Sequence, residues 1–162
     1  MLETIDLSET AGCTCRRARR MTRQLIRIFD NALLPTGLSA NQFEVLVYLY
    51  GCGVERKGHV SVGTLAGLIG KHPTTLNRDL KPLKEQGLVA DVAVRADSRV
   101  RGVIITSKGR IKLSKAIPFW RGAQSGIQKI LGIKTTRTLN ELLDLVFAKL
   151  ETITGNRDLT GR

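Results

Sequence analysis

Residues 60–109 constrain the fold of this chain most, because two short helices and a hairpin follow one another within them. Ser61 is a suitable N-cap for a first helix, and Gly70 is a suitable end for it. A second helix is predicted to begin near Pro73, whose missing N–H is not needed in a first turn, and to end at Gly87. The apolar positions that predict the inward faces of both helices are Leu65, Ala66, Leu68, Ile69, Leu76, Leu80 and Leu83. Two helices joined by so short a turn predict a helix-turn-helix.

A β-hairpin is predicted directly after the second helix. Residues 88–94 and 103–106 are rich in β-branched side chains, and a short polar turn around Asp97 joins them. A helix-turn-helix followed by a hairpin is a winged helix-turn-helix, in which the hairpin is the wing. Pro82 lies inside the second helix and predicts a bend there.

The second helix and the hairpin tip carry groups that grip a nucleic acid duplex. They are Lys71, Thr74, Thr75, Asn77, Arg78 and Lys81 near the helix, and Arg95, Arg99 and Arg101 near the tip. Hydroxyl, amide and guanidinium groups contact base edges in the major groove or the adjacent phosphates, and the lysines contact phosphates. Arg99 and Arg101 are predicted to enter the neighbouring minor groove. The alternatives are a helix cap for Thr74 and a solvated face for Asn77 and Arg78.

The net charge of +12 is concentrated in two segments. Residues 13–29 hold six arginines and no acidic residue, and residues 54–112 hold twelve basic residues against five acidic ones. Concentrated positive charge favours phosphate neutralisation with counterion release. A basic surface that serves only solubility is the alternative, so charge alone does not decide for nucleic acid.

Amphipathic helices are predicted on both sides of the winged unit. Residues 13–34 place apolar side chains at steps of three and four until Pro35. A second helical pattern covers residues 107–131 with a break at Pro118, and a last helix is predicted to begin at Thr138, with Thr138 and Glu141 as a capping box. The small winged core cannot cover all of these apolar stripes. We therefore expect the helices to pack against a second copy of the chain.

Between the first helix and the helix-turn-helix, Ser39 and Gln42 predict a capping box for another helix. Its inward side chains are predicted to be Phe43, Leu46, Val47 and Tyr50. A glycine-rich connection over residues 51–58, which contains Cys52, is expected to follow.

The predicted fold class is mainly α with a small antiparallel β wing. The expected organisation is a flexible N-terminal arm over residues 1–12, a helical dimerisation region over 13–36 and 110–153, a winged helix-turn-helix DNA-binding domain over 37–109, and a flexible tail over 154–162.

Five short segments occur in a fixed order along the chain. They are GLSANQF at 37–43, TTLNRDLKPL at 74–83, GLV at 87–89, DSRVR at 97–101 and TSKG at 106–109. Each is weak alone, but together they resemble the MarR family of bacterial winged-helix regulators. The resemblance covers about residues 13–150.

This resemblance implies a homodimer in which the first and last helices form the dimer layer and each winged helix reads one half-site of a palindromic operator. Family members are commonly repressors that a small anionic aromatic ligand or thiol oxidation releases from DNA. The acid at the position of Asp97 typically braces the wing arginine, and proline at the position of Pro82 is tolerated in one branch.

A ligand of that kind requires a cationic and apolar crevice. Arg16, Arg20, Arg23 and Arg27 follow one face of the first helix and have three open roles, which are to line such a crevice, to pair with acids of a partner, or to face solvent. The candidate effector pocket combines Arg20 with Phe43, Tyr48 and Trp120, and core packing is the alternative role of the three aromatic residues.

The three cysteines are too few for a disulfide framework and lack the spacing of a zinc site. Cys13 and Cys15 stand at the start of the first helix, where the helix dipole and nearby arginines favour thiolate chemistry. They are the candidate redox residues, with a bond across a dimer favoured over one between such close neighbours. Inert thiols are the alternative.

Other classes of protein have less support. The sequence has no phosphate-binding glycine loop and no paired histidine ligands, so neither an enzyme nor a metal or cofactor site is expected. A winged helix that binds RNA or single strands without operator specificity is the main rival, although it calls for exposed aromatic residues to stack bases. No apolar run approaches the ~18 residues of a membrane span, and the acidic N-terminus is unlike a secretory signal, so we expect a cytoplasmic protein.

Overall fold

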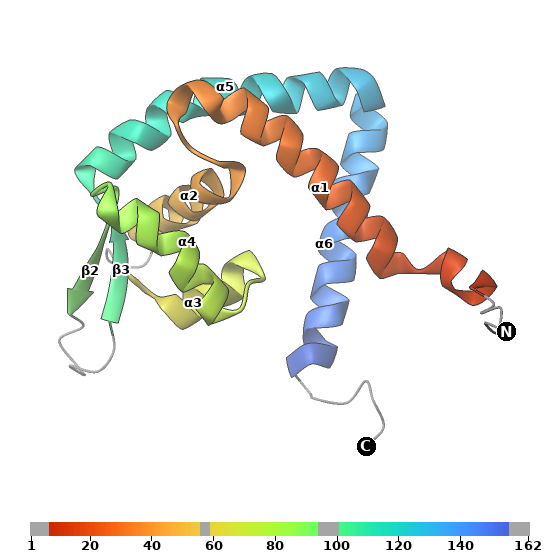
Figure 1. Cartoon of the computed structure of the whole chain (residues 1–162), viewed down its shortest axis with the longest axis horizontal. Helices are drawn as coiled ribbons and strands as arrows, with labels where there is room; N and C mark the ends of the chain where they lie inside the picture. The colour runs from red at the N-terminus through yellow and green to blue at the C-terminus, as the bar shows by residue number, and fades with distance from the viewer. Residues whose placement is uncertain (1–6, 56–58, 94–100, 156–162) are drawn as a thin grey trace, which may run out of the picture. The chain divides into compact units, whose positions relative to one another are not determined.

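The computed structural model describes residues 7–55, 59–93 and 101–155 (Figure 1). The chain divides into two compact units, Met1–Trp120 and Arg121–Arg162, and the division falls within one long helix. Each unit is described by itself. The predicted fold class is confirmed, because the described elements are helices apart from one small antiparallel sheet.

The first unit begins with two helical segments and their short 3-10 neighbours, namely η1 (Ser8–Gly12), α1 (Thr14–Leu33), η2 (Leu34–Thr36) and α2 (Ala40–Glu55). The winged part follows with β1 (Val60–Ser61), α3 (Val62–Ile69), α4 (Pro73–Glu85), β2 (Val89–Ala93) and β3 (Arg101–Ile105). Helix α5 (Ser107–Leu131) begins in this unit and ends in the second, where α6 (Ile133–Gly155) follows.

Helix α2 begins where the sequence predicts. The hydroxyl of Ser39 accepts a hydrogen bond from the N–H of Gln42 at 3.2 Å, and the Gln42 side chain accepts one from the N–H of Ser39 at 3.0 Å. The predicted capping box is therefore confirmed. Asp30 of α1 also accepts the N–H of Ala40 at 2.7 Å. A carboxylate is favoured at a helix start, so this bond ties α1 to α2.

Helix α2 is longer than predicted and buries a different face. It continues to Glu55, so the predicted connection is wrong for residues 51–55, and Cys52 is a buried helical residue. Val47 and Tyr50 are 41% and 47% exposed, whereas Val45 and Leu49 are buried. The reason is that α2 packs against α1, α3, α4 and β3, so its apolar residues do not form a single stripe.

Helices α3 and α4 form the predicted helix-turn-helix. The Ser61 hydroxyl accepts the N–H of Thr64 at 3.0 Å, and Gly70 ends α3 with a φ of 71°, the left-handed conformation that favours glycine. Leu68 is 39% exposed, so its predicted inward orientation is wrong, because the one-sided packing of this short helix leaves it outside the core. Helix α4 starts at Pro73 and continues through Pro82.

The sheet has three strands in the order β1-β3-β2, all antiparallel. Strands β2 and β3 form the predicted hairpin, in register from Val89 opposite Ile105 to Ala93 opposite Arg101. Strand β1 pairs Val60 with Val103 and is absent from the prediction. Two residues are too short to display the alternation that identifies a strand.

One core serves the whole winged part. Side chains with no exposed area come from α1, α2, α3, α4, β3 and α5, namely Leu33, Val45, Leu46, Leu65, Leu76, Leu80, Leu83, Val103 and Ala116. Because helices and sheet share this core, the position of α4 is set by residues on every neighbouring element.

Helix α5 runs through Pro118 without a break, which the sequence analysis did not predict. Both Pro118 and Ser114, whose carbonyl loses its helical partner, are exposed. Water can therefore satisfy that carbonyl, and the interruption costs less than it would inside a core.

In the second unit, α6 begins earlier than predicted. Gly132 ends α5 with a φ of 81°, and α6 starts at Ile133, so Thr138 and Glu141 lie inside the helix and the predicted capping box is wrong. The Thr136 hydroxyl instead donates to the Gly132 carbonyl at 3.0 Å. Helix α6 leaves six large apolar side chains 46–52% exposed, namely Leu142, Leu143, Leu145, Val146, Phe147 and Leu150.

Candidate nucleic-acid interface

Helix α4 separates its apolar and polar side chains onto two faces. Leu76, Leu80 and Leu83 have no exposed area. The polar residues Thr74, Thr75, Asn77, Arg78 and Lys81 are all exposed, and we call them the α4 polar face. Among the described residues, no hydrogen bond or ion pair engages the side chains of Asn77, Arg78 or Lys81. The α4 polar face is therefore available to a molecule that carries hydrogen-bond acceptors and negative charge.

The first turn of α4 is capped by a residue that the sequence pattern does not reveal. His72 Nδ1 accepts the N–H of Thr74 at 3.4 Å, and Pro73 fills the first helical position. Histidine is not a preferred N-cap, so no sequence rule points to it. The Thr74 side chain is not the cap, which leaves its hydroxyl on the exposed face.

Lys71 lies apart from the α4 polar face. Its Nζ is 3.1 Å from Asp79 Oδ2 and 3.5 Å from Glu44 Oε2, and the side chain is 18% exposed. It also donates to Asn41 Oδ1 at 3.5 Å. We call Lys71, Asp79, Glu44 and Asn41 the lysine clamp, because their bonds join α2, the α3–α4 turn and α4. The sequence predicts a phosphate contact for Lys71, whereas in the structure its charge lies between two carboxylates.

The end of α4 is fastened to the hairpin. Lys84 Nζ lies 2.6 Å from Asp91 Oδ1 on β2. The Thr106 hydroxyl donates to the Gly87 carbonyl at 2.7 Å, and the Thr106 N–H donates to the Leu88 carbonyl at 3.0 Å. These bonds fix the direction of the wing strands relative to α4.

The start of α5 packs directly on the segment that follows α4. A Cβ at Gly109 would lie 2.1 Å from the Leu88 carbonyl oxygen and 2.8 Å from Ile105 Cγ1, so only glycine fits there. Lys108 Nζ also donates to the Gln86 carbonyl at 2.7 Å. The segment at 106–109 that contributes to the family resemblance thus joins the end of α4, the hairpin and α5.

The hairpin tip falls outside the described residues, and with it the predictions for Arg95, Asp97 and Arg99. Arg101 is the first residue of β3, with its backbone opposite Ala93, and its side chain is not described. Strands β2 and β3, which precede and follow the tip in the chain, pair with each other as predicted.

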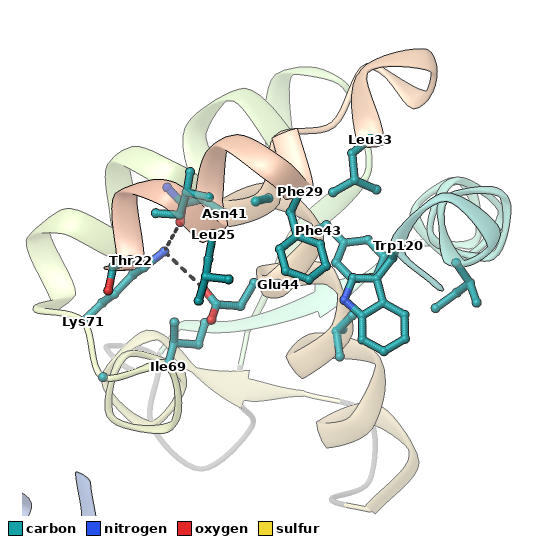
Figure 2. A pocket seen from close by; sticks show the side chains of 15 residues that line it. Thr22, Leu25, Phe29, Leu33, Asn41, Phe43, Glu44, Ile69, Lys71 and Trp120 are labelled. Atoms are coloured by element: carbon teal, nitrogen blue, oxygen red, sulfur yellow. Dashed lines mark hydrogen bonds and ion pairs between the residues drawn. The ribbon is translucent and has the colours of Figure 1, made fainter. Parts of the chain in front are cut away.

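A pocket of about 670 Å³ opens between α1, α2, the end of α3 and α5 (Figure 2). Phe43 and Trp120 line it and stack, with ring centroids 6.1 Å apart and planes at 17°. Arg20 and Tyr48, the other two predicted effector residues, are exposed and do not line this pocket. The structure therefore brings together half of the predicted effector residues.

The lysine clamp forms one edge of the same pocket. Lys71, Glu44 and Asn41 line it, and Figure 2 shows the Lys71 side chain directed at the other two. The remaining wall near them is apolar and includes Leu25 and Ile69. The contacts of Lys71 with Asn41, Glu44 and Asp79 leave no periodic signal in a sequence, so the sequence does not point to Glu44 or Asp79.

The first half of α1 is exposed on all sides over residues 14–24. Arg16 donates to the Thr10 carbonyl at 3.0 Å, Arg17 donates to the Ala11 carbonyl at 3.4 Å, and Arg27 donates to Gln24. Among the described residues, no carboxylate pairs with an arginine of α1. The charge of this segment is therefore uncompensated within the described part of the chain.

Cys13 directly precedes α1 and Cys15 lies in its first turn, and both thiols are free and exposed. Cys52 is free and buried. Only the first two thiols are accessible to an oxidant.

No family model and no curated protein matches the chain, but solved structures do. MosR of M. tuberculosis, a MarR-family transcriptional regulator solved in complex with DNA, is 33% identical, with a TM-score of 0.74 over 87% of this chain and 98% of MosR. The chain belongs to the MarR family.

Other MarR-family structures share its fold. A mutant MarR from E. coli, complexed with operator DNA, is 22% identical, with a TM-score of 0.73 over 88% of this chain and 99% of that chain. A MarR-family regulator from Rhodococcus sp. RHA1 is 22% identical, with a TM-score of 0.68 over 89% and 96%. These relatives are transcriptional regulators rather than enzymes. In the described part of this MarR-family chain, no helix is both long and apolar enough to cross a membrane.

Proposed function

We propose that this chain is a transcriptional repressor that binds double-stranded DNA as a homodimer, with each winged helix on one half of a palindromic operator. The observation that carries the proposal is the exposed α4 polar face, held on a buried leucine face. The 33% identity to a regulator solved with DNA supports it. The second helix of a helix-turn-helix enters the major groove with its first turns against base edges.

The α4 polar face supplies both kinds of contact that operator binding needs. Asn77 and Arg78 present an amide and a guanidinium, which can pair with adenine and guanine edges. Thr74 and Thr75 lie in the first turn of α4 and are assigned to bases or adjacent phosphates, and Lys81, about two turns further along, is assigned to a phosphate.

The wing adds contacts in the minor groove. We assign Arg99 and Arg101 to this groove, where narrow A·T-rich segments attract guanidinium groups. Asp97 is assigned to bracing a wing arginine rather than to DNA. Bonds from β2 and from the start of α5 to the end of α4 hold the wing in a fixed direction relative to α4. This arrangement favours simultaneous contact of the wing and α4 with neighbouring grooves.

The homodimer is proposed to use the apolar side chains that α6 exposes, together with α1. Large half-exposed apolar surfaces mark interfaces. Val146→Asp should convert the dimer to monomer in sedimentation, whereas Asn140→Asp, which adds the same charge to an exposed polar position of α6, should leave the dimer intact. A wild-type chain that sediments as a monomer at micromolar concentration would contradict the dimer.

The effector is proposed to be a small aromatic molecule in the pocket lined by Phe43 and Trp120. A planar ligand can stack on these rings, and pockets of this size bury drug-sized molecules. The lysine clamp links this pocket to α4, because a ligand that moves Lys71 changes its ion pair with Asp79. Ligand binding would in this way alter the position of the α4 polar face and so DNA binding.

A redox response is proposed at Cys13 and Cys15. Peroxide would oxidise two thiols to one disulfide and be reduced to two water molecules, with a bond across the dimer favoured over one between the close neighbours Cys13 and Cys15. Peroxide treatment should lower DNA affinity of the wild-type chain and of Cys52→Ser, but not of the double variant Cys13→Ser with Cys15→Ser, which lacks both exposed thiols. Unchanged affinity in the oxidised wild-type chain would remove the proposal.

Competition at moderate salt tests the class of nucleic acid. Fluorescence anisotropy with a labelled duplex should show that unlabelled duplex DNA competes far better than single-stranded DNA or RNA of equal length. Stacking of single strands needs exposed aromatic residues, and the α4 polar face contains none. Equal or stronger competition by RNA would favour a general RNA-binding winged helix instead.

A further inference from the structure

The charges around the pocket do not match an anionic ligand. Among the described residues, Lys71 is the one basic residue that lines it. Its Nζ lies 3.5 Å from the carboxylate of Glu44, which also lines the pocket, and 3.1 Å from that of Asp79, which lies outside the lining. The lysine clamp therefore carries one positive and two negative charges. Arg20, the cation that the sequence analysis offers to a ligand carboxylate, does not line the pocket.

A carboxylate ligand would have to displace one of these partners from Lys71 or lie beside Glu44. Two carboxylates within about 4–6 Å of each other repel, and the repulsion is larger beside an apolar wall than in bulk water. An uncharged group meets no such cost. Thr22 and Asn41 also line the pocket and offer a hydroxyl and an amide, both neutral hydrogen-bonding groups.

The rest of the lining selects for a flat apolar body. Phe29, Phe43 and Trp120 contribute three aromatic rings, and Leu25 and Ile69 contribute aliphatic wall. Aromatic walls favour planar ligands through offset stacking. At about 670 Å³ the pocket has room for two fused rings with a polar substituent.

We propose that this pocket selects uncharged aromatic ligands that carry a hydrogen-bond donor, and discriminates against aromatic carboxylates. The donor faces Glu44, whose carboxylate accepts it, while the rings lie against Phe43 and Trp120. The inference rests on the proposed effector function and specifies its ligand class.

Naphthamide and naphthoate form a matched pair of probes, since they share shape and differ in charge. In calorimetric titration of the full chain without DNA, naphthamide should bind at least about tenfold more tightly than naphthoate. Glu44→Gln should narrow this ratio by raising the affinity for naphthoate. Glu85→Gln, an exposed glutamate of α4 outside the pocket, should leave the ratio unchanged.

A filled pocket gives the second control. Ile26→Trp places a large side chain in the pocket wall and should abolish naphthamide binding, whereas Ile111→Trp, at a position that is 59% exposed and outside this pocket, should not. Circular dichroism should establish that both variants fold.

Three results would overturn the proposal. They are naphthoate binding as tight as naphthamide binding, no naphthamide binding at all, and naphthamide binding that Ile26→Trp leaves intact. Naphthamide binding that disappears as chain concentration rises would show that a second copy occupies the pocket, and would overturn it as well. Since the titration contains no DNA, failure of the repressor proposal would leave these results unchanged, and their failure would leave duplex binding unchanged.

Discussion

Helices α1 and α4 both expose basic side chains, but they hold them in different ways. Helix α4 buries three leucines, is capped by His72 and is joined to β2 through Lys84 and Asp91. The first half of α1 is exposed on every side, and among the described residues its arginines Arg16 and Arg17 donate to the nearby carbonyls of Thr10 and Ala11. Base readout needs side chains held on a rigid element, whereas phosphate attraction needs only charge. Sequence-specific contacts are therefore expected from α4, and at most salt-dependent attraction from α1.

The largest expected effect comes from disturbing the contact between the start of α5 and the segment that follows α4. Gly109→Ala forces a Cβ against the Leu88 carbonyl and should destabilise the fold by about 3 kcal/mol, a drop in melting temperature of about 6–12 °C. Gly122→Ala is the control, because a Cβ there meets nothing within 4 Å. It should raise stability by about 0.5–1 kcal/mol, since glycine is unfavourable inside a helix. Equal melting temperatures in calorimetry would show that this contact does not hold α4.

Removal of the guanidinium from the α4 polar face should have the next largest effect. Arg78→Ala should weaken operator binding by about 1–3 kcal/mol, about 5- to 150-fold, and should change binding to unrelated duplexes much less. Gel-shift titrations on both duplexes measure the difference. A small, equal loss on both would mean that Arg78 contacts only phosphate.

Loss of one amide should change preference more than affinity. Asn77→Ala should relax selection at one or two base pairs, each worth about 1–3 kcal/mol in the wild-type chain. Binding to operators substituted one base pair at a time measures this. Sequence-independent losses for every substitution on the α4 polar face would contradict base readout.

A substitution in the wing tests a charge contribution to DNA binding that does not depend on base sequence. Arg99→Ala should weaken binding about uniformly across duplexes and reduce the slope of log affinity against log salt by about 0.9. An unchanged slope would show that the charge of Arg99 does not contribute to DNA binding.

The smallest effect is expected on α1. Arg20→Ala should change stability by less than about 0.5 kcal/mol and operator affinity by less than about threefold at physiological salt. Sedimentation should be run beside the binding assay, because dimer loss would place Arg20 in the interface. A loss of operator affinity as large as that of Arg78→Ala would remove the distinction between the two helices.

Local chemistry explains which parts of the fold the sequence predicts. Ser39 with Gln42, Ser61 with Gly70, and Pro73 mark helix ends through contacts within a few residues, and all of these ends are confirmed. The inward face of α2 depends on which elements surround it, and the predicted inward orientation of Val47 and Tyr50 is wrong for that reason. The start of α6 depends on Gly132, which a capping-box match at Thr138 obscured.

The candidate site also combines features that local sequence predicts with features that depend on packing between distant residues. The exposure of Asn77, Arg78 and Lys81 follows from the leucine spacing of α4, so the sequence predicts it. The lysine clamp depends on contacts between α2, the α3–α4 turn and α4, which no local pattern encodes. Phe43 and Trp120 are far apart in the chain, and only the packing of α2 against α5 determines that they stack.

Selection of bound duplexes from a random pool tests the central claim most directly. If two copies of the α4 polar face press into the major groove, the selected sequences should contain an inverted repeat with half-site centres about 10 base pairs, or a multiple of that, apart. The same selection with Asn77→Ala should lose the preference at matching positions of both half-sites. A pool that shows no enriched sequence, or one that Asn77→Ala leaves unchanged, would contradict the account.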